Sequence, residues 1–236
     1  MCVLDLFSIS IMIILRGIKK SIPRQRISVY ADRRLLLFTG WPVNCSHTME
    51  EEVKMGKRIV VLNGSPRKNG NTSALVKSFT EGAQKAGHTV TEFFLDQMEI
   101  HGCKGCFGGD SSRECPCAQK DDMDQIYPEV KSCDVVVFAT PLYYWNMSGQ
   151  IRTAVDRLFA LEEGKEGILR GQGRGGVLLM AAEGDGFEDV VLYFDHLMEH
   201  LRWDNLGHVL AGGNMNVGDI SGKPEIQMAF DLGASI

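Results

Sequence analysis

A loop rich in glycine, hydroxyl, amide and cationic side chains follows an apolar run at residues 59–62. The loop extends from Gly64 to Thr72, where a helical pattern of apolar residues begins. A strand that ends in such a loop at a helix N-terminus forms an anion site, because the free N–H groups and the positive end of the helix dipole point toward the ligand. The side chains suited to contact an anion there are Ser65, Arg67, Asn69, Asn71 and Thr72.

The spacing of this loop excludes two common nucleotide motifs. Five residues separate Gly64 from Gly70, and Asn71 stands where the lysine of a Walker loop would be. The dinucleotide pattern G-x-G-x-x-G is absent as well, since no glycine lies two positions after Gly64. Without a lysine for β- and γ-phosphates, the loop suits a terminal monophosphate, such as that of flavin mononucleotide (FMN). The alternative is an ordinary strand–helix turn with Asn71 or Thr72 as the helix cap.

Strand and helix patterns alternate after the loop. Short apolar runs predict strands at 58–63, 89–95, 134–140, 176–182 and 206–211, and periodic apolar residues predict helices at 72–86, 121–132, from 148 onward, 186–201 and 224–232. The alternation predicts an α/β, flavodoxin-like fold, which is a doubly wound five-stranded parallel sheet of order 2-1-3-4-5 with helices on both faces. Strands 1 and 3 are neighbours in that order, and ligands bind outside their carboxyl ends.

The segment after strand 3 is apolar and aromatic, with the sequence Pro141-Leu142-Tyr143-Tyr144-Trp145-Asn146. Aromatic rings there can cover a planar ring system, and backbone amides and Asn146 can form hydrogen bonds with its edge. The alternative is an aromatic cluster that closes the core under a loop. Because strands 1 and 3 are predicted neighbours, we expect this segment and the phosphate loop to border one crevice.

Several segments together resemble the NAD(P)H-dependent FMN reductase family and the related iron–sulfur flavoproteins. They are 64–72, the C-K-G-C of 103–106, the K-D-D-M of 120–123, the P-L-Y-Y of 141–144 and the helix 148–157. The resemblance spans about 57–236 and implies non-covalently bound FMN. It implies that the phosphate lies on Ser65, Arg67, Asn69, Asn71 and Thr72, that the ring lies on Pro141, Leu142, Tyr143, Tyr144, Trp145 and Asn146, and that Glu183 and Gly184 lie near its other side.

The same resemblance implies an oxidoreductase of the flavin or quinone reductase type. Hydride would pass from NAD(P)H to N5 of FMN, and electrons would then reach a small-molecule acceptor such as a flavin or a quinone. This chemistry needs no acid or base from the protein, so no catalytic side chain is predicted. Members of the family form dimers or tetramers, and we expect a homodimer or homotetramer. The alternative is an electron carrier of the flavodoxin or iron–sulfur flavoprotein type.

Four of the seven cysteines lie in one predicted loop, at Cys103, Cys106, Cys115 and Cys117. Four thiolates suit an iron–sulfur cluster or tetrahedral zinc. The iron–sulfur relatives place a third cysteine three residues after the second, and here that residue is Gly109. Free thiols or a reversible disulfide, in a loop on the substrate side, are therefore favoured over a [4Fe-4S] cluster or zinc.

Composition narrows the classes of function further. The 236 residues are 44% hydrophobic with a net charge of −5, which gives no indication of nucleic-acid binding. Residues 1–55 are predicted to be an extension outside the fold or the product of a misassigned start, and 56–236 to form the FMN-binding domain. The apolar run 2–15 is too short to span a bilayer and lacks the features of an export signal. We expect no membrane span and a cytoplasmic location, with a weak membrane-surface anchor as the alternative.

A remote alternative function comes from the sequence H-x-x-E-H at 196–200. His196, Glu199 and His200 match an inverted zinc-peptidase signature. The same predicted helix already carries an apolar stripe, and no further carboxylate ligand follows in a suitable context. We therefore expect both histidines on the surface beside that stripe.

Overall fold

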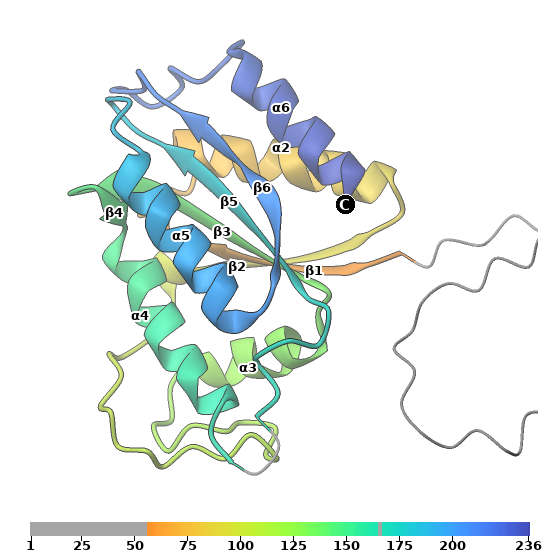
Figure 1. Ribbon diagram of the computed structural model, residues 1–236. Coiled ribbons are helices and arrows are strands. Elements are labelled where there is room, and N and C mark those ends of the chain that lie inside the picture. Colours follow the sequence, from red (N-terminus) through yellow and green to blue (C-terminus); the bar gives the residue numbers. More distant parts are fainter. Residues whose placement is uncertain (1–55, 165–166) are drawn as a thin grey trace, which may run out of the picture. The chain divides into compact units, whose positions relative to one another are not determined.

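The computed structural model describes residues 56–164 and 167–236, so the extension predicted at 1–55 lies outside the described residues. Strands and helices alternate along the described chain (Figure 1). The elements are β1 (Arg58–Asn63), α2 (Asn71–Lys85), β2 (Thr89–Phe94), η2 (Leu95–Gln97), α3 (Met123–Ser132), β3 (Val135–Tyr143), β4 (Asn146–Met147), α4 (Gly149–Arg157), η3 (Leu158–Leu161), β5 (Gly175–Ala181), α5 (Glu188–Leu201), β6 (Asp204–Ala211) and α6 (Pro224–Ser235). In this part of the chain no helix has the length and apolar content needed to cross a bilayer.

The sheet confirms the predicted topology. Five parallel strands lie in the order β2-β1-β3-β5-β6, which is the order 2-1-3-4-5 when only these strands are counted. The register pairs Asn63 at the end of β1 with Ala139 of β3. The carboxyl ends of β1 and β3 therefore lie side by side at one edge of the sheet.

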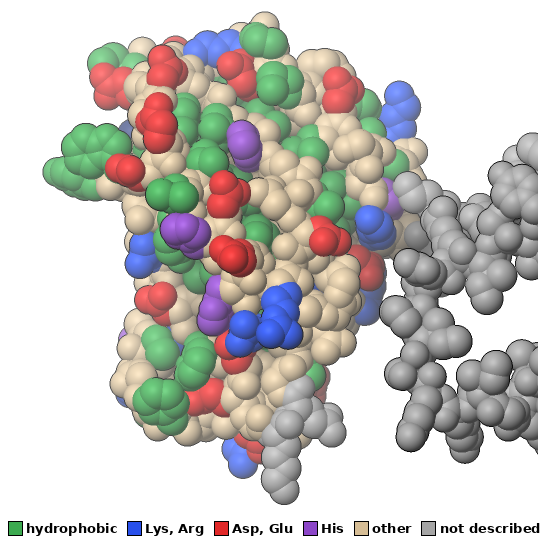
Figure 2. All heavy atoms as spheres, in the orientation of Figure 1, with side chains coloured by type: hydrophobic (Ala, Val, Ile, Leu, Met, Phe, Trp, Pro, Cys, Tyr) green, Lys and Arg blue, Asp and Glu red, His purple; other side chains and the backbone are tan. Residues whose placement is uncertain are grey.

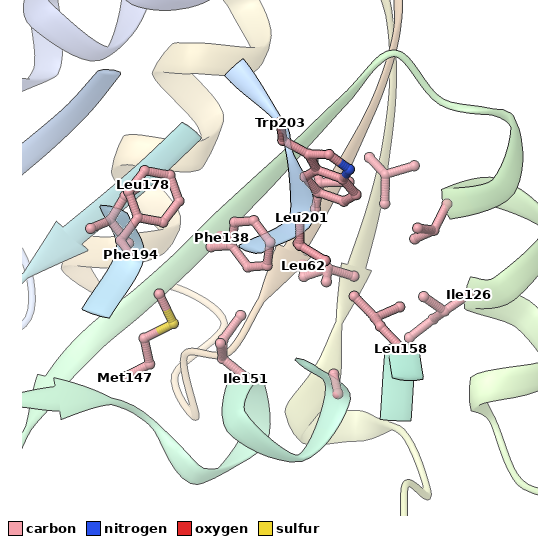
Figure 3. Close-up of a cluster of buried hydrophobic side chains, with 14 of the residues drawn as sticks. Leu62, Ile126, Phe138, Met147, Ile151, Leu158, Leu178, Phe194, Leu201 and Trp203 are labelled. Atoms are coloured by element: carbon pink, nitrogen blue, oxygen red, sulfur yellow. The ribbon is translucent and has the colours of Figure 1, made fainter. Parts of the chain in front are cut away.

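Alternating side chains of the strands fill two apolar layers, one on each face of the sheet. Val60 and Leu62 of β1 pack with residues of α3, α4 and α5, whereas Ile59 and Val61 pack with residues of α2 and α6. Figure 3 shows the first layer, in which Phe138 and Trp203 lie among aliphatic side chains. Because both faces are covered, the central strands β1, β3 and β5 are mostly apolar and buried, as parallel strands in this class are. The edge strand β2 keeps several exposed residues.

The structure differs from the predicted strand 3 at its carboxyl end. We predict a strand that stops at Thr140 and a loop at 141–146, but β3 continues to Tyr143 and pairs with β4 in an antiparallel hairpin. Leu142 pairs with Met147, and Tyr143 pairs with Asn146. The aromatic segment is therefore a short, ordered hairpin and not an irregular loop.

Candidate functional site

Two hydrogen bonds join the loop after β1 to β3 and to the start of α4. The N–H of Gly64 donates to the carbonyl of Ala139 at 2.8 Å. The hydroxyl of Ser148 donates to the carbonyl of Gly64 at 2.7 Å, and this serine stands at the N-cap of α4 without capping that helix. The two strand ends thus form one wall, which the predicted crevice requires.

The polar loop after β1 is held in shape by its own side chains. The buried amide of Asn63 accepts a hydrogen bond from the N–H of Ser65 at 3.0 Å. The hydroxyl of Ser65 accepts from the N–H of Arg67 and donates to its carbonyl, at 3.2 and 3.1 Å. The chain then passes so closely around Gly70 that a Cβ on that residue would lie 3.1 Å from the Cβ of Arg67.

The N-terminus of α2 has no side-chain cap. Gly70 is its N-cap residue, so the alternative in which Asn71 or Thr72 caps the helix is wrong. Asn71 instead donates to the carbonyl of Asn216 and accepts from the N–H of Gly218, at 2.8 and 2.9 Å. The first N–H groups of α2 have no acceptor within the helix and carry the positive end of its dipole. They are therefore suited to an anion.

A hollow of about 280 Å³ lies over these two strand ends. It brings together eight of the thirteen residues predicted to bind a cofactor, which are Ser65, Arg67, Asn71, Thr72, Pro141, Leu142, Tyr143 and Glu183. The guanidinium of Arg67 is exposed and forms no ion pair or hydrogen bond with any other described residue. The hollow therefore combines groups suited to an anion with apolar groups.

A second hollow, of about 480 Å³, lies beside the first and shares Leu142 and Tyr143 with it. Tyr144, Trp145 and Gly184 line this second hollow. The other two predicted residues line neither of them. Asn69 faces a separate hollow of about 660 Å³ beside α2, and the side chain of Asn146 accepts a hydrogen bond from the N–H of Met147.

The tip of the β3–β4 hairpin is strained and exposed. Tyr144 and Trp145 are its two central residues, with φ of +48° and +58°, a conformation that usually requires asparagine or glycine. Their side chains are 94% and 61% exposed. Figure 2 shows hydrophobic side chains that project from the surface beside the place of β4 in Figure 1. Strain and exposed aromatic surface together are typical of a ligand-contacting segment.

Sequence reasoning missed four residues of this site. Asn63 and Ser148 shape the two strand ends, and Asn214 and Met215, in the loop after β6, line the smaller hollow. The loop after β6 carries no motif. The available signal was its place in the fold, because the loops after all parallel strands lie at the same edge of the sheet.

The four-cysteine loop is attached to the layer formed by α3, α4 and α5, at the end of that layer away from the two hollows. Cys103 lines a hollow together with Phe159 and His200, which lie near the C-terminal ends of α4 and α5. These helices run antiparallel to the strands, so their C-terminal ends lie at the amino edge of the sheet. The prediction that this loop lies on the substrate side is therefore wrong within a single chain.

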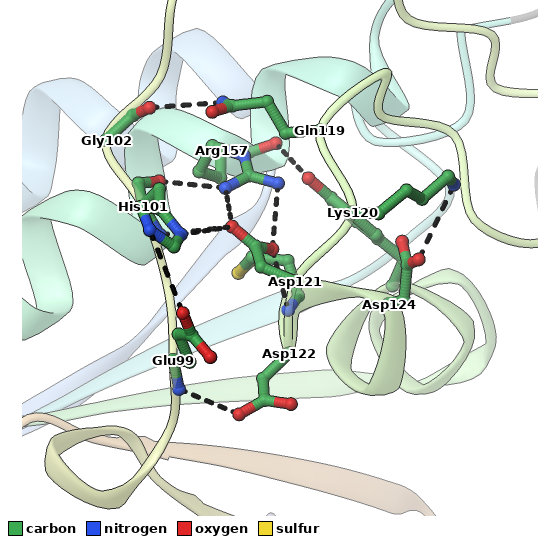
Figure 4. A network of polar contacts seen from close by, with 11 residues as sticks. Glu99, His101, Gly102, Gln119, Lys120, Asp121, Asp122, Asp124 and Arg157 are labelled. Carbon is green, nitrogen blue, oxygen red and sulfur yellow. Dashed lines mark hydrogen bonds and ion pairs between the residues drawn. The ribbon is translucent and has the colours of Figure 1, made fainter.

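A buried ion pair ties both ends of that loop to α4 (Figure 4). The guanidinium of Arg157 is fully buried, donates to both carboxylate oxygens of Asp121, and donates to the carbonyl of His101 at 2.8 Å. Burial alone would raise the pKa of the Asp121 carboxyl, but the hydrogen bonds from Arg157 and from two backbone N–H groups hold that pKa below its usual 3.8. The loop therefore has a rigid base.

The four cysteines of the loop are not grouped as metal ligands in the described structure. Among the described residues no group of three or more histidine, cysteine or acidic side chains is placed to hold a metal ion. All four thiols are free, and Cys103 and Cys106 are exposed. Burial and the nearby Asp124 carboxylate raise the pKa of the Cys115 thiol. As arranged, these side chains do not fit an iron–sulfur cluster or zinc.

The H-x-x-E-H segment lacks metal-site geometry too. His196 and His200 are exposed on α5 beside its buried stripe, as predicted. The Nε2 of His200 lies 3.5 Å from a carboxylate oxygen of Glu162. The zinc-peptidase alternative has no support in this arrangement.

Comparisons with known proteins agree with this geometry. The sequence profile described as NADPH-dependent FMN reductase matches residues 57–215. An iron–sulfur flavoprotein of Archaeoglobus fulgidus is 30% identical over 182 residues, which cover 76% of this chain and 78% of that protein. An iron–sulfur flavoprotein of Methanosarcina thermophila is 27% identical over 167 residues, which cover 71% of this chain and 83% of that protein. The structure of an NAD(P)H:quinone oxidoreductase from Methanothermobacter marburgensis superimposes with a TM-score of 0.60 at 18% identity, over 76% of this chain and 96% of that one.

Proposed function

The chain belongs to the NADPH-dependent FMN reductase family and is an FMN-dependent oxidoreductase, and we propose that FMN occupies the two adjoining hollows at the ends of β1 and β3. In this proposal the donor is NAD(P)H and the acceptor is a small quinone- or flavin-like molecule. Support for the acceptor class comes from the shared fold with a quinone oxidoreductase. When bound, the flavin supplies hydride acceptance at N5 and electron donation to the second substrate.

One observation carries the proposal, which is the uncapped N-terminus of α2 beside the unpaired cation of Arg67. Helix N–H groups and a free guanidinium are the donors that a phosphate monoester prefers. Thr72 is buried in the first turn of α2 and lines the same hollow. Ser65 and Asn71 have a different role. The side chain of Ser65 holds the loop after β1 in shape, and that of Asn71 holds the segment around Asn216 against it.

The other end of the site suits a planar ring. Leu142 and Tyr143 border both hollows, and Trp145 extends the apolar wall next to Gly184. No side chain has to donate or remove a proton in this reaction, so the residues act by position. With FMN bound, Leu142, Tyr143 and Trp145 would hold the ring system beside the hairpin and shield it from water on that side.

A pair of matched variants tests the phosphate assignment. Arg67→Gln removes the free cation of the smaller hollow, whereas Lys68→Gln removes an equal charge one residue away, outside that hollow. We expect Arg67→Gln to weaken FMN binding roughly tenfold to a hundredfold, the range for a hydrogen bond between charged groups. Binding of riboflavin, which lacks the phosphate, should change little. Equal losses for the two ligands, or for the two variants, would contradict the assignment.

Kinetics separate this function from an electron carrier. A reductase oxidises NADPH rapidly when a quinone is present, and a carrier does not. Stopped-flow oxidation of NADPH under anaerobic conditions makes the distinction. A homo-oligomeric state, a cytoplasmic location and a separate role for residues 1–55 stay predictions.

A further inference from the structure

We infer that Asn214, in the loop after β6, is a further flavin-binding residue whose side-chain oxygen accepts a hydrogen bond from a hydroxyl of the ribityl chain. This assignment rests on the proposed function. It adds the end of a fourth strand, β6, to the site. It also explains why the site would bind ribityl flavins more tightly than other planar molecules that carry a phosphate.

The first observation is an acceptor without a partner. Asn214 is 7% exposed, and its Oδ1 is buried with no hydrogen-bond donor among the described residues. A buried acceptor without a donor costs stability, and such groups are rare in folded proteins. Asn214 also lines the smaller hollow, beside the phosphate loop and the end of β3. A ligand in that hollow can supply the donor.

The orientation of the amide is fixed by its nitrogen. The Nδ2 of Asn214 donates to the carbonyls of Ala211 and Gly212, at 2.8 and 2.9 Å. Two carbonyl oxygens can only face the NH₂ group, so a flipped amide is excluded. The Oδ1 must therefore point away from them.

The loop that carries Asn214 is braced from two sides. The N–H of Asn214 donates to the carbonyl of Ala182 at 2.8 Å, which ties the loop to the end of β5. The Nζ of Lys223 donates to the carbonyls of Gly212 and Gly213, at 3.0 and 2.8 Å. The acceptor is thus held in place before any ligand arrives, which lowers the cost of binding.

The chemistry of the hollow identifies the partner group. An amide oxygen repels a phosphate and offers nothing to an apolar ring face, whereas a hydroxyl can donate to it. The hollow has its anion-binding groups at Arg67 and Thr72 and its apolar groups at Leu142 and Tyr143. In FMN the ribityl chain, with its three free hydroxyls, joins the phosphate to the ring. Asn214 lines the same hollow as both sets of groups, so its neutral acceptor matches a ribityl hydroxyl.

The test compares FMN with its 2′-, 3′- and 4′-deoxy analogues on the full chain, with the dissociation constant measured by quenching of flavin fluorescence. We expect the wild-type protein to bind one of the three analogues roughly five- to thirtyfold more weakly than FMN, the effect of one buried hydrogen bond. In Asn214→Leu, which keeps the branching of the side-chain heavy atoms and has no acceptor, FMN and that analogue should bind equally well.

The outcomes separate this assignment from the proposed function. If the wild-type protein binds all three analogues as tightly as FMN, or if Asn214→Leu keeps the full preference, Asn214 is not a ribityl ligand, although FMN still binds. If the wild-type protein binds no FMN, the proposed function and this assignment both fail. Should Asn214→Leu not fold, the wild-type comparison still refutes the assignment if all three analogues bind as tightly as FMN.

Discussion

Replacing Gly64 by alanine should force the two strand ends of the site apart. A Cβ at this position would lie 2.3 Å from the Cγ1 of Ile151 and 2.7 Å from the Oγ of Ser148. Both contacts are far inside van der Waals distance, and both residues belong to the start of α4. The backbone of Gly64 is not in a conformation reserved for glycine, so the effect comes from crowding alone.

The size of the effect follows from these contacts. Overpacking by one methyl group in a filled core costs about 1–3 kcal/mol. The buried bond from Ser148 to the carbonyl of Gly64 adds about 1 kcal/mol if it breaks. A loss of about 2–4 kcal/mol corresponds to a fall in Tm of roughly 4–16 °C for a domain of this size. FMN binding should weaken as well, since the methyl group separates the two loops that form the hollow.

Gly149→Ala is the matched control for this experiment. It adds a methyl group to α4, the helix that the Gly64 methyl group would contact, at a position where no atom of another segment lies within 4 Å. We expect its Tm and FMN affinity to stay near the wild-type values, or its Tm to rise slightly, because alanine favours the helix. Calorimetry of the apo proteins and flavin titration give both quantities. If Gly64→Ala matches the control in Tm and affinity, the close contact between the strand ends is not part of the site.

Three further predictions concern the ion pair, the hairpin and the thiols. Asp121→Asn leaves the buried guanidinium of Arg157 without its counter-charge, so urea unfolding at pH 7 should show a free energy of unfolding about 3–5 kcal/mol lower than that of the wild type. The pKa of Asp121 in the folded state lies below its usual 3.8. The stability difference between wild type and variant should therefore be complete above pH 3.8 and shrink as the pH falls through the lower folded-state pKa. Changing the hairpin tip 144–145 from Tyr-Trp to Asn-Gly should raise the free energy of unfolding of the apo protein by about 1–2 kcal/mol in the same assay, because it removes backbone strain. It should also slow quinone reduction, because it removes the aromatic wall. Unchanged turnover would show that the tip is only structural. Among the cysteines that the structure describes, iodoacetamide should label the exposed Cys103 and Cys106 first and Cys133 last, as measured by mass spectrometry, because burial raises the pKa of the Cys133 thiol to about 11. Early labelling of Cys133 would contradict the described packing.

The sheet order and one of the site's loops could be predicted because their signals are local. The apolar run of β1 and the polar loop after it stand next to each other in the sequence, and strand–helix alternation leaves few topologies to consider. The boundaries of β1, α2 and α6 agree with the predicted ranges within one to three residues. These features depend on periodicity and turn chemistry, which the sequence carries directly.

The remaining features depend on contacts between distant segments. Nothing near Asn214 shows that its amide is oriented by two carbonyls, and nothing near Tyr144 shows that β3 continues into a hairpin with φ above zero at its tip. The sequence predicts the wrong side for the cysteine loop because the position of this loop depends on Arg157, which lies more than thirty residues further along the chain. Such contacts become visible only once the chain is folded.

The most direct test of the FMN site is the absorption spectrum of the purified protein, recorded after addition of FMN and again after anaerobic addition of NADPH. The account predicts that stoichiometric FMN remains bound through gel filtration with a shifted flavin spectrum, and that NADPH bleaches the flavin band, which a quinone then restores. Protein that stays colourless after incubation with FMN would contradict the central claim that the hollow between the ends of β1 and β3 holds this cofactor.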